Sequence, residues 1–416
     1  MKEMIVVLDI GTTKISMTYG EINKEGELNI SGYEEVIATG LSNGVIVNID
    51  KTVEEVLVVK KKLEKFIGIC INKVYLLLSE NICSIYKNRG MIAISSEEKE
   101  ITANDIKRVI DVTTAIPTSK HNTIIGIDPY EYVVDGIRNV SDPVGMIGHR
   151  LELKANIIIS KTSIITNLEK VVEKSGLKVL GRVLQPISIS NIILRREKVN
   201  YVTSIVDVGG ENTGISIFEG SNLVDMYTIP IGGKNITKDI GYFFKLSFNT
   251  AEAIKKSLID FSVGYDEEEE VLIENSFHEK VPIKKSLLND VAYDRVEEIL
   301  NMIKDSFKRY DKSINRVVLV GGGLGEFPGI EEIIKYNLKI PCKVYKERLF
   351  DEEKSLLAPS IAAIKDEYNN YFPLEEKELS KIHADKEVEQ QEVSGKVGIV
   401  TKLRAFIDEF LWGRGG

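Results

Sequence analysis

The alternation of apolar and polar residues predicts two similar β-hairpins in distant parts of the chain. The first is IVVLDIGTTKISMTYGE at 5–21, and the second is SIVDVGGENTGISIFEG at 204–220. Each has an apolar strand, an Asp-x-Gly turn with small polar residues, and a second strand that contains an Ile-Ser pair. Phosphate loops of the Walker and Rossmann types lead from a strand into a helix, so they are a different kind of site. Two related hairpins predict two related lobes that face each other.

Both turns have the composition of a phosphate-binding loop. Glycine lets the backbone approach a phosphate, while hydroxyls and backbone N–H groups donate to its oxygens. A carboxylate at the strand end, here Asp9 or Asp207, suits a hydrated Mg²⁺. A Gly-Thr turn also occurs in ordinary hairpins, so the prediction depends on the pair. The candidate phosphate-binding residues are Gly11, Thr12, Thr13 and Lys14 in the first turn, and Gly209, Gly210, Asn212 and Thr213 in the second.

Two further segments have residues that suit a nucleoside. In RVVLVGGGLGEFPGIEEIIKYNL, 316–338, a strand leads through Gly321, Gly322 and Gly323 into a helix, so the chain can pass under a base or ribose. Sharp strand-to-helix turns also use glycine for other reasons. In AEAIKKSL, 251–258, Glu252 and Lys255 share a helical face and could hold ribose hydroxyls and the base edge. A surface ion pair explains their spacing equally well.

The last 21 residues, KVGIVTKLRAFIDEFLWGRGG at 396–416, have apolar residues at helical spacing. At 100° per residue, most of these side chains fall within one arc of about 140°. This pattern predicts a helix that lies in the plane of a membrane surface. A helix packed on the folded body is the alternative. The residues expected at the membrane are Ile399, Val400, Leu403, Arg404, Phe406, Ile407, Phe410, Leu411 and the interfacial Trp412.

Composition and charge divide the chain into a folded body, an acidic linker and this terminal segment. With 416 residues and 43% apolar content, the chain is long enough for two or more lobes. Of the net charge of −9, the segment 366–395 contributes −6, from nine acidic residues against three lysines. We expect this segment to be a disordered linker. No basic cluster is present, which argues against general nucleic-acid binding.

The order of these elements is more specific than any one of them. Hairpin, hairpin, Glu-x-x-Lys helix and Gly-Gly-Gly strand end follow each other as in the actin-like ATPase superfamily, which this chain resembles. The resemblance implies that ATP and Mg²⁺ bind between the lobes, with Asp9 and Asp207 contacting Mg²⁺ through water. It also implies a catalytic role for Gln185, in LQPISISNII, in aligning an attacking water. A helix that starts with a proline after a polar residue is the alternative.

Within that superfamily, the segments 82–161 and 229–258 closely resemble the FtsA family of bacterial cell-division proteins. The implied fold is α/β, an actin-like two-lobed fold with the FtsA-type 1C insertion, followed by a disordered linker and a C-terminal amphipathic helix. The expected domains are 1A at 1–81 and 162–198, 1C at 82–161, 2A at 199–228 and 309–365, 2B at 229–308, the linker at 366–395, and the membrane-targeting helix at 396–416.

The resemblance also implies a function. FtsA-like proteins bind ATP, form filaments and attach the FtsZ ring to the cytoplasmic face of the cell membrane at the septum, where they recruit other division proteins. In the predicted helix from Leu287 to Phe307, Arg295 and Glu298 match residues of the family that contact the FtsZ C-terminal peptide. Charges on the solvent side of a helix need no partner, so this assignment has an ordinary alternative.

Glu211 departs from the family pattern. It places a carboxylate in the second phosphate loop, where glycine is usual, and predicts a Coulombic cost near phosphates unless the side chain turns outward or meets Mg²⁺. We therefore expect weak ATPase activity at most. A small-molecule kinase of the same superfamily is the alternative function, although a kinase has no use for an acidic linker and a membrane helix.

Overall fold

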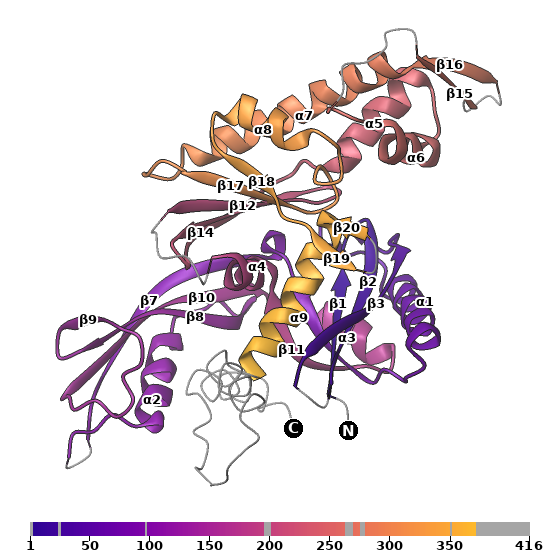
Figure 1. The fold of residues 1–416 in the computed structure, drawn as a ribbon. Helices are drawn as coiled ribbons and strands as arrows, with labels where there is room; N and C mark the ends of the chain where they lie inside the picture. The colour runs from indigo at the N-terminus through magenta and orange to yellow at the C-terminus, as the bar shows by residue number, and fades with distance from the viewer. Residues whose placement is uncertain are drawn as a thin grey trace, which may run out of the picture.

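The computed structural model describes residues 3–23, 26–95, 98–194, 201–262, 269–274, 279–349 and 352–371. Figure 1 shows two lobes and a smaller domain beside the first lobe. The predicted α/β, two-lobed fold is confirmed.

Lobe 1 is built on a five-stranded sheet in the order β11-β6-β1-β2-β3. The first predicted hairpin is present, since β1 runs antiparallel to β2, while β6 runs parallel to β1. The strands are β1 (Glu3–Ile10), β2 (Lys14–Ile22), β3 (Leu28–Ile37), β6 (Lys73–Leu78) and β11 (Lys178–Leu184). Helices on both faces explain why β2 is buried along nearly its whole length.

Alternate residues of β1 face different helices of lobe 1. Val6 and Leu8 belong to the core with α1 (Ile49–Ile67) and α3 (Thr162–Lys174). Ile5 and Val7 pack with α9 (Ala358–Tyr371) on the opposite face. The helix α4 (Gln185–Ile193) lies against α9. The period-two pattern of the strand therefore places helices on both sides of the sheet.

Lobe 2 repeats this sheet. Its order is β14-β13-β12-β17-β18, again with an antiparallel hairpin beside two parallel strands. The strands are β12 (Val202–Val208), β13 (Thr213–Glu219), β14 (Asn222–Ile229), β17 (Arg316–Val320) and β18 (Cys342–Val344). The second predicted hairpin, β12–β13, is therefore confirmed, and the two lobes share one strand topology.

Four helices complete lobe 2: α5 (Gly233–Phe244), α6 (Phe248–Leu258), α7 (Lys285–Phe307) and α8 (Ile330–Leu338). They pack with the sheet in one apolar core. The hairpin of β15 (Glu270–Glu274) and β16 (Lys280–Lys284) precedes α7. The predicted helix over 287–307 is confirmed and begins two residues earlier. Its apolar face is buried at Leu288, Ile299, Ile303 and Phe307 and half-buried at Val291.

The smaller domain has a core of its own. Its sheet, in the order β7-β10-β8-β9, is covered by α2 (Ala103–Thr114). The strands are β7 (Cys83–Ala93), β8 (Asn122–Val134), β9 (Ile137–Val140) and β10 (Arg150–Lys161). The short helix η1 (Glu80–Ile82) connects β6 to β7 and contacts β13 and β14 of lobe 2.

The structure corrects the expected start of the acidic linker. The segment was predicted to be disordered from residue 366, but α9 extends to Tyr371. Asp366 is buried there and accepts hydrogen bonds from Ser188 Oγ and Asn191 Nδ2, both at 3.0 Å. Residues 372–416, which include the predicted membrane helix, lie outside the described residues. In the part of the chain that is described, no helix is both long and apolar enough to cross a membrane.

Candidate functional site

The two predicted phosphate loops have the same closing hydrogen bond and touch each other between the lobes. The Gly11 N–H donates to the Lys14 carbonyl at 3.0 Å, and the Gly209 N–H donates to the Asn212 carbonyl at 3.0 Å. Gly210 lies against the Thr13 side chain so closely that a Cβ on Gly210 would be 2.6 Å from Thr13 Oγ1. The structure thus brings together two loops that are distant in sequence.

Asp9 and Asp207 face this junction from opposite lobes. Both side chains keep some contact with solvent, but the surrounding protein desolvates them. Burial raises the pKa of Asp9 to about 6, with Lys14 opposing this shift and the Asp207 charge adding to it. Burial also raises the pKa of Asp207. Two neighbouring carboxylates whose charge Lys14 offsets only in part fit a hydrated divalent cation.

Direct coordination of a metal by a larger cluster is not supported. Among the described residues, no group of three His, Cys, Asp or Glu side chains is arranged to hold a metal ion. Contact of Asp9 and Asp207 with Mg²⁺ through water stays a prediction.

Gln185 joins this group. It is buried at the first position of α4, and its Nε2 donates to Asp207 Oδ2 at 2.7 Å. Pro186 at the next position suits a helix start because its missing N–H has no partner there. Gly321 lies against the Asp207 carboxylate. The φ of Gly321 is +88°, and a Cβ on Gly321 would lie 2.1 Å from Asp207 Oδ1. A side chain at residue 321 would displace the carboxylate.

Glu80 is a site residue that sequence reasoning missed. It lies in η1 of lobe 1 and is buried over Gly214 of β13, where a Cβ on Gly214 would be 1.6 Å from Glu80 Oε1. Burial and the nearby Asp207 charge raise its pKa to about 8. Its Oε2 has no hydrogen-bond partner among the described residues. No motif marks Glu80, because its neighbours in the site come from lobe 2.

The predicted nucleoside-binding glycines pack against the second phosphate loop. The Gly323 N–H donates to the Val208 carbonyl at 2.8 Å, and a Cβ on Gly323 would lie 2.6 Å from the Gly209 carbonyl oxygen. Gly322 lies in the same turn, close to Leu356. The structure therefore joins Gly321–323 to the site, whereas their contact with a base or ribose stays a prediction.

Lys255 differs from its predicted environment. It is buried, and its ammonium donates to the Gly233 carbonyl, Thr237 Oγ1 and Glu252 Oε2 at 3.2, 2.9 and 2.7 Å. An ammonium has three hydrogens to donate: two join α6 to Gly233 and Thr237 of α5, and the third binds Glu252 within α6. Lys255 is thus better suited to supporting the helix pair than to contacting a ligand. Glu252 is 25% exposed and stays a candidate ribose contact.

The Glu211 carboxylate is held by two donors at the second phosphate loop. It accepts from Lys234 Nζ at 2.9 Å and from the Asn43 backbone N–H at 2.7 Å. Partial burial opposes ionisation, but these donors hold the pKa of Glu211 below its usual range. The Coulombic cost expected from the sequence is therefore offset locally.

The predicted partner-binding residues lie on a different surface. Arg295 on α7 donates through Nε to Asp239 Oδ2 at 2.5 Å and also pairs with Glu298. Figure 1 shows α7 at the outer side of lobe 2, away from the phosphate loops. These charges therefore form a surface separate from the interlobe site.

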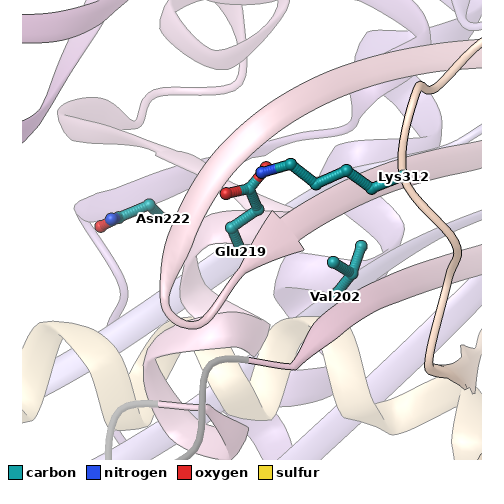
Figure 2. A pocket seen from close by; sticks show the side chains of 4 residues that line it. All are labelled: Val202, Glu219, Asn222 and Lys312. Atoms are coloured by element: carbon teal, nitrogen blue, oxygen red, sulfur yellow. The ribbon is translucent and has the colours of Figure 1, made fainter.

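A cavity of about 330 Å³ lies at the other end of the second hairpin and is lined by Val202, Glu219, Asn222 and Lys312. Figure 2 shows the Glu219 and Lys312 side chains meeting, and their ion pair measures 2.6 Å. Val202 begins β12 and Glu219 ends β13, whereas the phosphate loop joins the opposite ends of these strands. This cavity is thus not part of the candidate site.

Sequence comparisons agree with this architecture. Residues 81–159 match the family model described as "SHS2 domain inserted in FTSA", and residues 204–365 match "Cell division protein FtsA". The chain is 30% identical to the FtsA of Bacillus subtilis over 352 residues, which cover 82% of this chain and 79% of the relative. It is 33% identical to the FtsA of Enterococcus faecalis over 347 residues, covering 81% and 78%.

Solved structures share the fold at low sequence identity. A chain of the PilM-PilN type IV pilus biogenesis complex has a TM-score of 0.60 at 13% identity, covering 88% of this chain and 97% of that chain. MreB5 of Spiroplasma citri bound to ADP has a TM-score of 0.50 at 13% identity, covering 92% and 99%. These likenesses support the actin-like fold alone.

Proposed function

Because the chain belongs to the FtsA family and therefore has a role in cell division, we propose that it is a nucleotide-dependent, self-assembling adaptor between the division machinery and the cytoplasmic membrane. The observation that carries the proposal is the pairing of Asp9 and Asp207 across two related phosphate loops. None of the relatives compared supports the small-molecule kinase alternative.

Mg-ATP is the proposed ligand of the interlobe site. Asp9 and Asp207 would hold the hydrated Mg²⁺, which supplies positive charge beside the phosphates. Glu252 and the glycines 321–323 are proposed for the nucleoside. Gln185 stays the candidate for orienting a water, but its amide N–H is donated to Asp207. We therefore propose slow hydrolysis at most. The proposed phosphate donors are Gly11, Thr12, Thr13, Lys14, Gly209, Gly210, Asn212 and Thr213.

A nucleotide titration tests this site. We expect Asp207→Asn to weaken Mg²⁺-dependent binding of a fluorescent ATP analogue by about tenfold or more, because one charge-assisted contact contributes about 1.5–3 kcal/mol. Arg295→Ala, on the separate surface, should bind as the wild type does. Equal affinity of Asp207→Asn and the wild type, with and without Mg²⁺, would contradict the proposed role of the carboxylate.

The adaptor needs two further contacts, which we propose from the sequence and the family. The segment 396–416 would bind the anionic cytoplasmic leaflet, and the surface with Arg295 and Glu298 would bind the C-terminal peptide of FtsZ. Assembly into filaments would present many weak membrane contacts together and so strengthen attachment. Co-sedimentation with anionic vesicles and with the labelled peptide tests both contacts. Other division proteins are further proposed partners at the septum.

A further inference from the structure

A charged pair bridges the two lobes beside the phosphate loops. Glu211 and Lys234, both in lobe 2, form an ion pair of 2.9 Å. Each partner also contacts lobe 1: Glu211 Oε2 accepts from the Asn43 N–H at 2.7 Å, and Lys234 Nζ donates to the Thr12 carbonyl at 3.1 Å. The three interactions form one continuous path between the lobes.

The lobe 2 side of this path is firmly positioned. Lys234 is the second residue of α5, and its backbone N–H donates to the Gly210 carbonyl at 2.7 Å, while the Gly233 N–H donates to the Gly209 carbonyl at 2.9 Å. The start of α5 is thereby bonded to the loop that carries Glu211. Movement of the second phosphate loop must therefore carry both charges with it.

The lobe 1 side is a tight turn. Asn43 and Gly44 connect β4 (Leu41–Ser42) to β5 (Val45–Ile46) and have φ of +49° and +77°. Two successive positive φ values match the two-residue turn of a β-hairpin. This turn directs the Asn43 N–H at Glu211, and no side-chain rotation is needed to keep the donor in place.

We propose that Glu211 and Lys234 form a latch that holds the two lobes together at the phosphate end of the site. The side chains are 24% and 20% exposed, so their hydrogen bonds are partly shielded from water. The Gly210–Thr13 contact lies beside the same loops, and separating the loops requires the latch bonds to Asn43 and Thr12 to break.

The latch has a kinetic consequence that rests on the proposed nucleotide binding. A nucleotide whose phosphates lie between the two loops leaves faster when the latch is removed. We expect Glu211→Ala and Lys234→Ala each to accelerate release of mant-ADP by about 10- to 100-fold, the range for loss of a charge-assisted hydrogen bond. The double variant should release mant-ADP only slightly faster than either single variant, because each substitution alone already breaks the latch.

Hydrogen exchange tests the latch without nucleotide. Mass spectrometry of peptides covering residues 38–48 reports on the Asn43 amide, whose acceptor is Glu211. We expect faster exchange there in Glu211→Ala and in Lys234→Ala. Lys238→Ala is the matched control, since it removes an exposed ammonium of α5 near Glu211 and should leave exchange unchanged.

A variant with the two charges exchanged distinguishes a latch between the lobes from an ion pair that acts only within lobe 2. Glu211→Lys with Lys234→Glu preserves the ion pair but places an ammonium beside the Asn43 N–H and a carboxylate beside the Thr12 carbonyl. We expect this variant to exchange as fast as Glu211→Ala. Wild-type exchange in Glu211→Ala or in the reversed pair would overturn the latch. Failure of the wild type to bind mant-ADP would instead refute the nucleotide proposal, and exchange would still decide the latch.

Discussion

At the scale of single residues, Glu80 makes stability depend on pH. Burial raises its pKa from 4.5 to about 8, so the folded chain keeps a proton that the unfolded chain loses. The free energy of unfolding should therefore fall as pH rises between about 4.5 and 8, at up to about 1.4 kcal/mol per pH unit for one proton. Asp9 contributes in the same direction between 3.8 and about 6.

Glu80→Gln is predicted to remove the part of this fall that lies between pH 6 and 8, because the amide is neutral throughout. The measurement is urea unfolding at several pH values in EDTA without nucleotide. Glu298→Gln, which changes an exposed carboxylate of α7, should keep the wild-type slope. Identical slopes for Glu80→Gln and the wild type would show that Glu80 is ionised in the folded protein at neutral pH.

The sequence predicted single site residues where the neighbouring residues in the sequence mark them. Asp9 and Asp207 stand in repeated turns, so a comparison of two short segments was enough to find them. Glu80 and Lys234 act through partners in the other lobe, and those partners are more than 120 positions away in the sequence. Their roles depend on how the two lobes pack together, and a local sequence pattern does not predict that packing. For Lys255, the local spacing from Glu252 suggested a contact with a ligand, but it could not show that the side chain is buried.

At the scale of elements, the buried Asp366 carboxylate links α9 to α4. Asp366 accepts from Ser188 and Asn191, and α4 begins with Gln185 of the candidate site. Asp366→Ala is predicted to lower the free energy of unfolding by about 2–3 kcal/mol, since two hydrogen bonds to a carboxylate are lost, and the Ser188 donor stays buried while the Asn191 donor stays half-buried. Urea unfolding at pH 7 measures this change.

Asp294→Ala is the control, because it removes a carboxylate from an exposed position of α7 and should alter stability by less than about 0.5 kcal/mol. Equal stability of Asp366→Ala and the wild type would mean that α9 is held by apolar packing alone. Asp366 also explains why the linker was predicted to begin too early. Counting charges cannot distinguish a solvated carboxylate from one whose partners lie 175 and 178 positions away.

At the scale of the whole molecule, the proposed partner surface lies far from the end of the described chain. Figure 1 shows α7, with Arg295 and Glu298, on the outer side of lobe 2, whereas α9 runs away from lobe 2 toward the other end of the molecule. One apolar core includes residues of lobe 1, the smaller domain and lobe 2, such as Leu8, Ile158 and Phe218. A body joined in this way holds the α7 surface apart from the end of α9, where the described part of the chain ends.

This arrangement predicts that each contact can be removed without the other. The labelled FtsZ C-terminal peptide should sediment with anionic vesicles only when the protein is present. Arg295→Glu should abolish peptide recruitment but keep the blue shift of Trp412, the one tryptophan of the chain, on vesicle binding. Leu403→Glu should abolish both signals, because a carboxylate in the apolar arc opposes insertion. Lys304→Glu, which reverses an exposed charge elsewhere on α7, should change neither signal.

Peptide recruitment that survives Arg295→Glu would place the partner surface elsewhere. An unshifted Trp412 emission in the wild type would refute membrane attachment through the C-terminal segment.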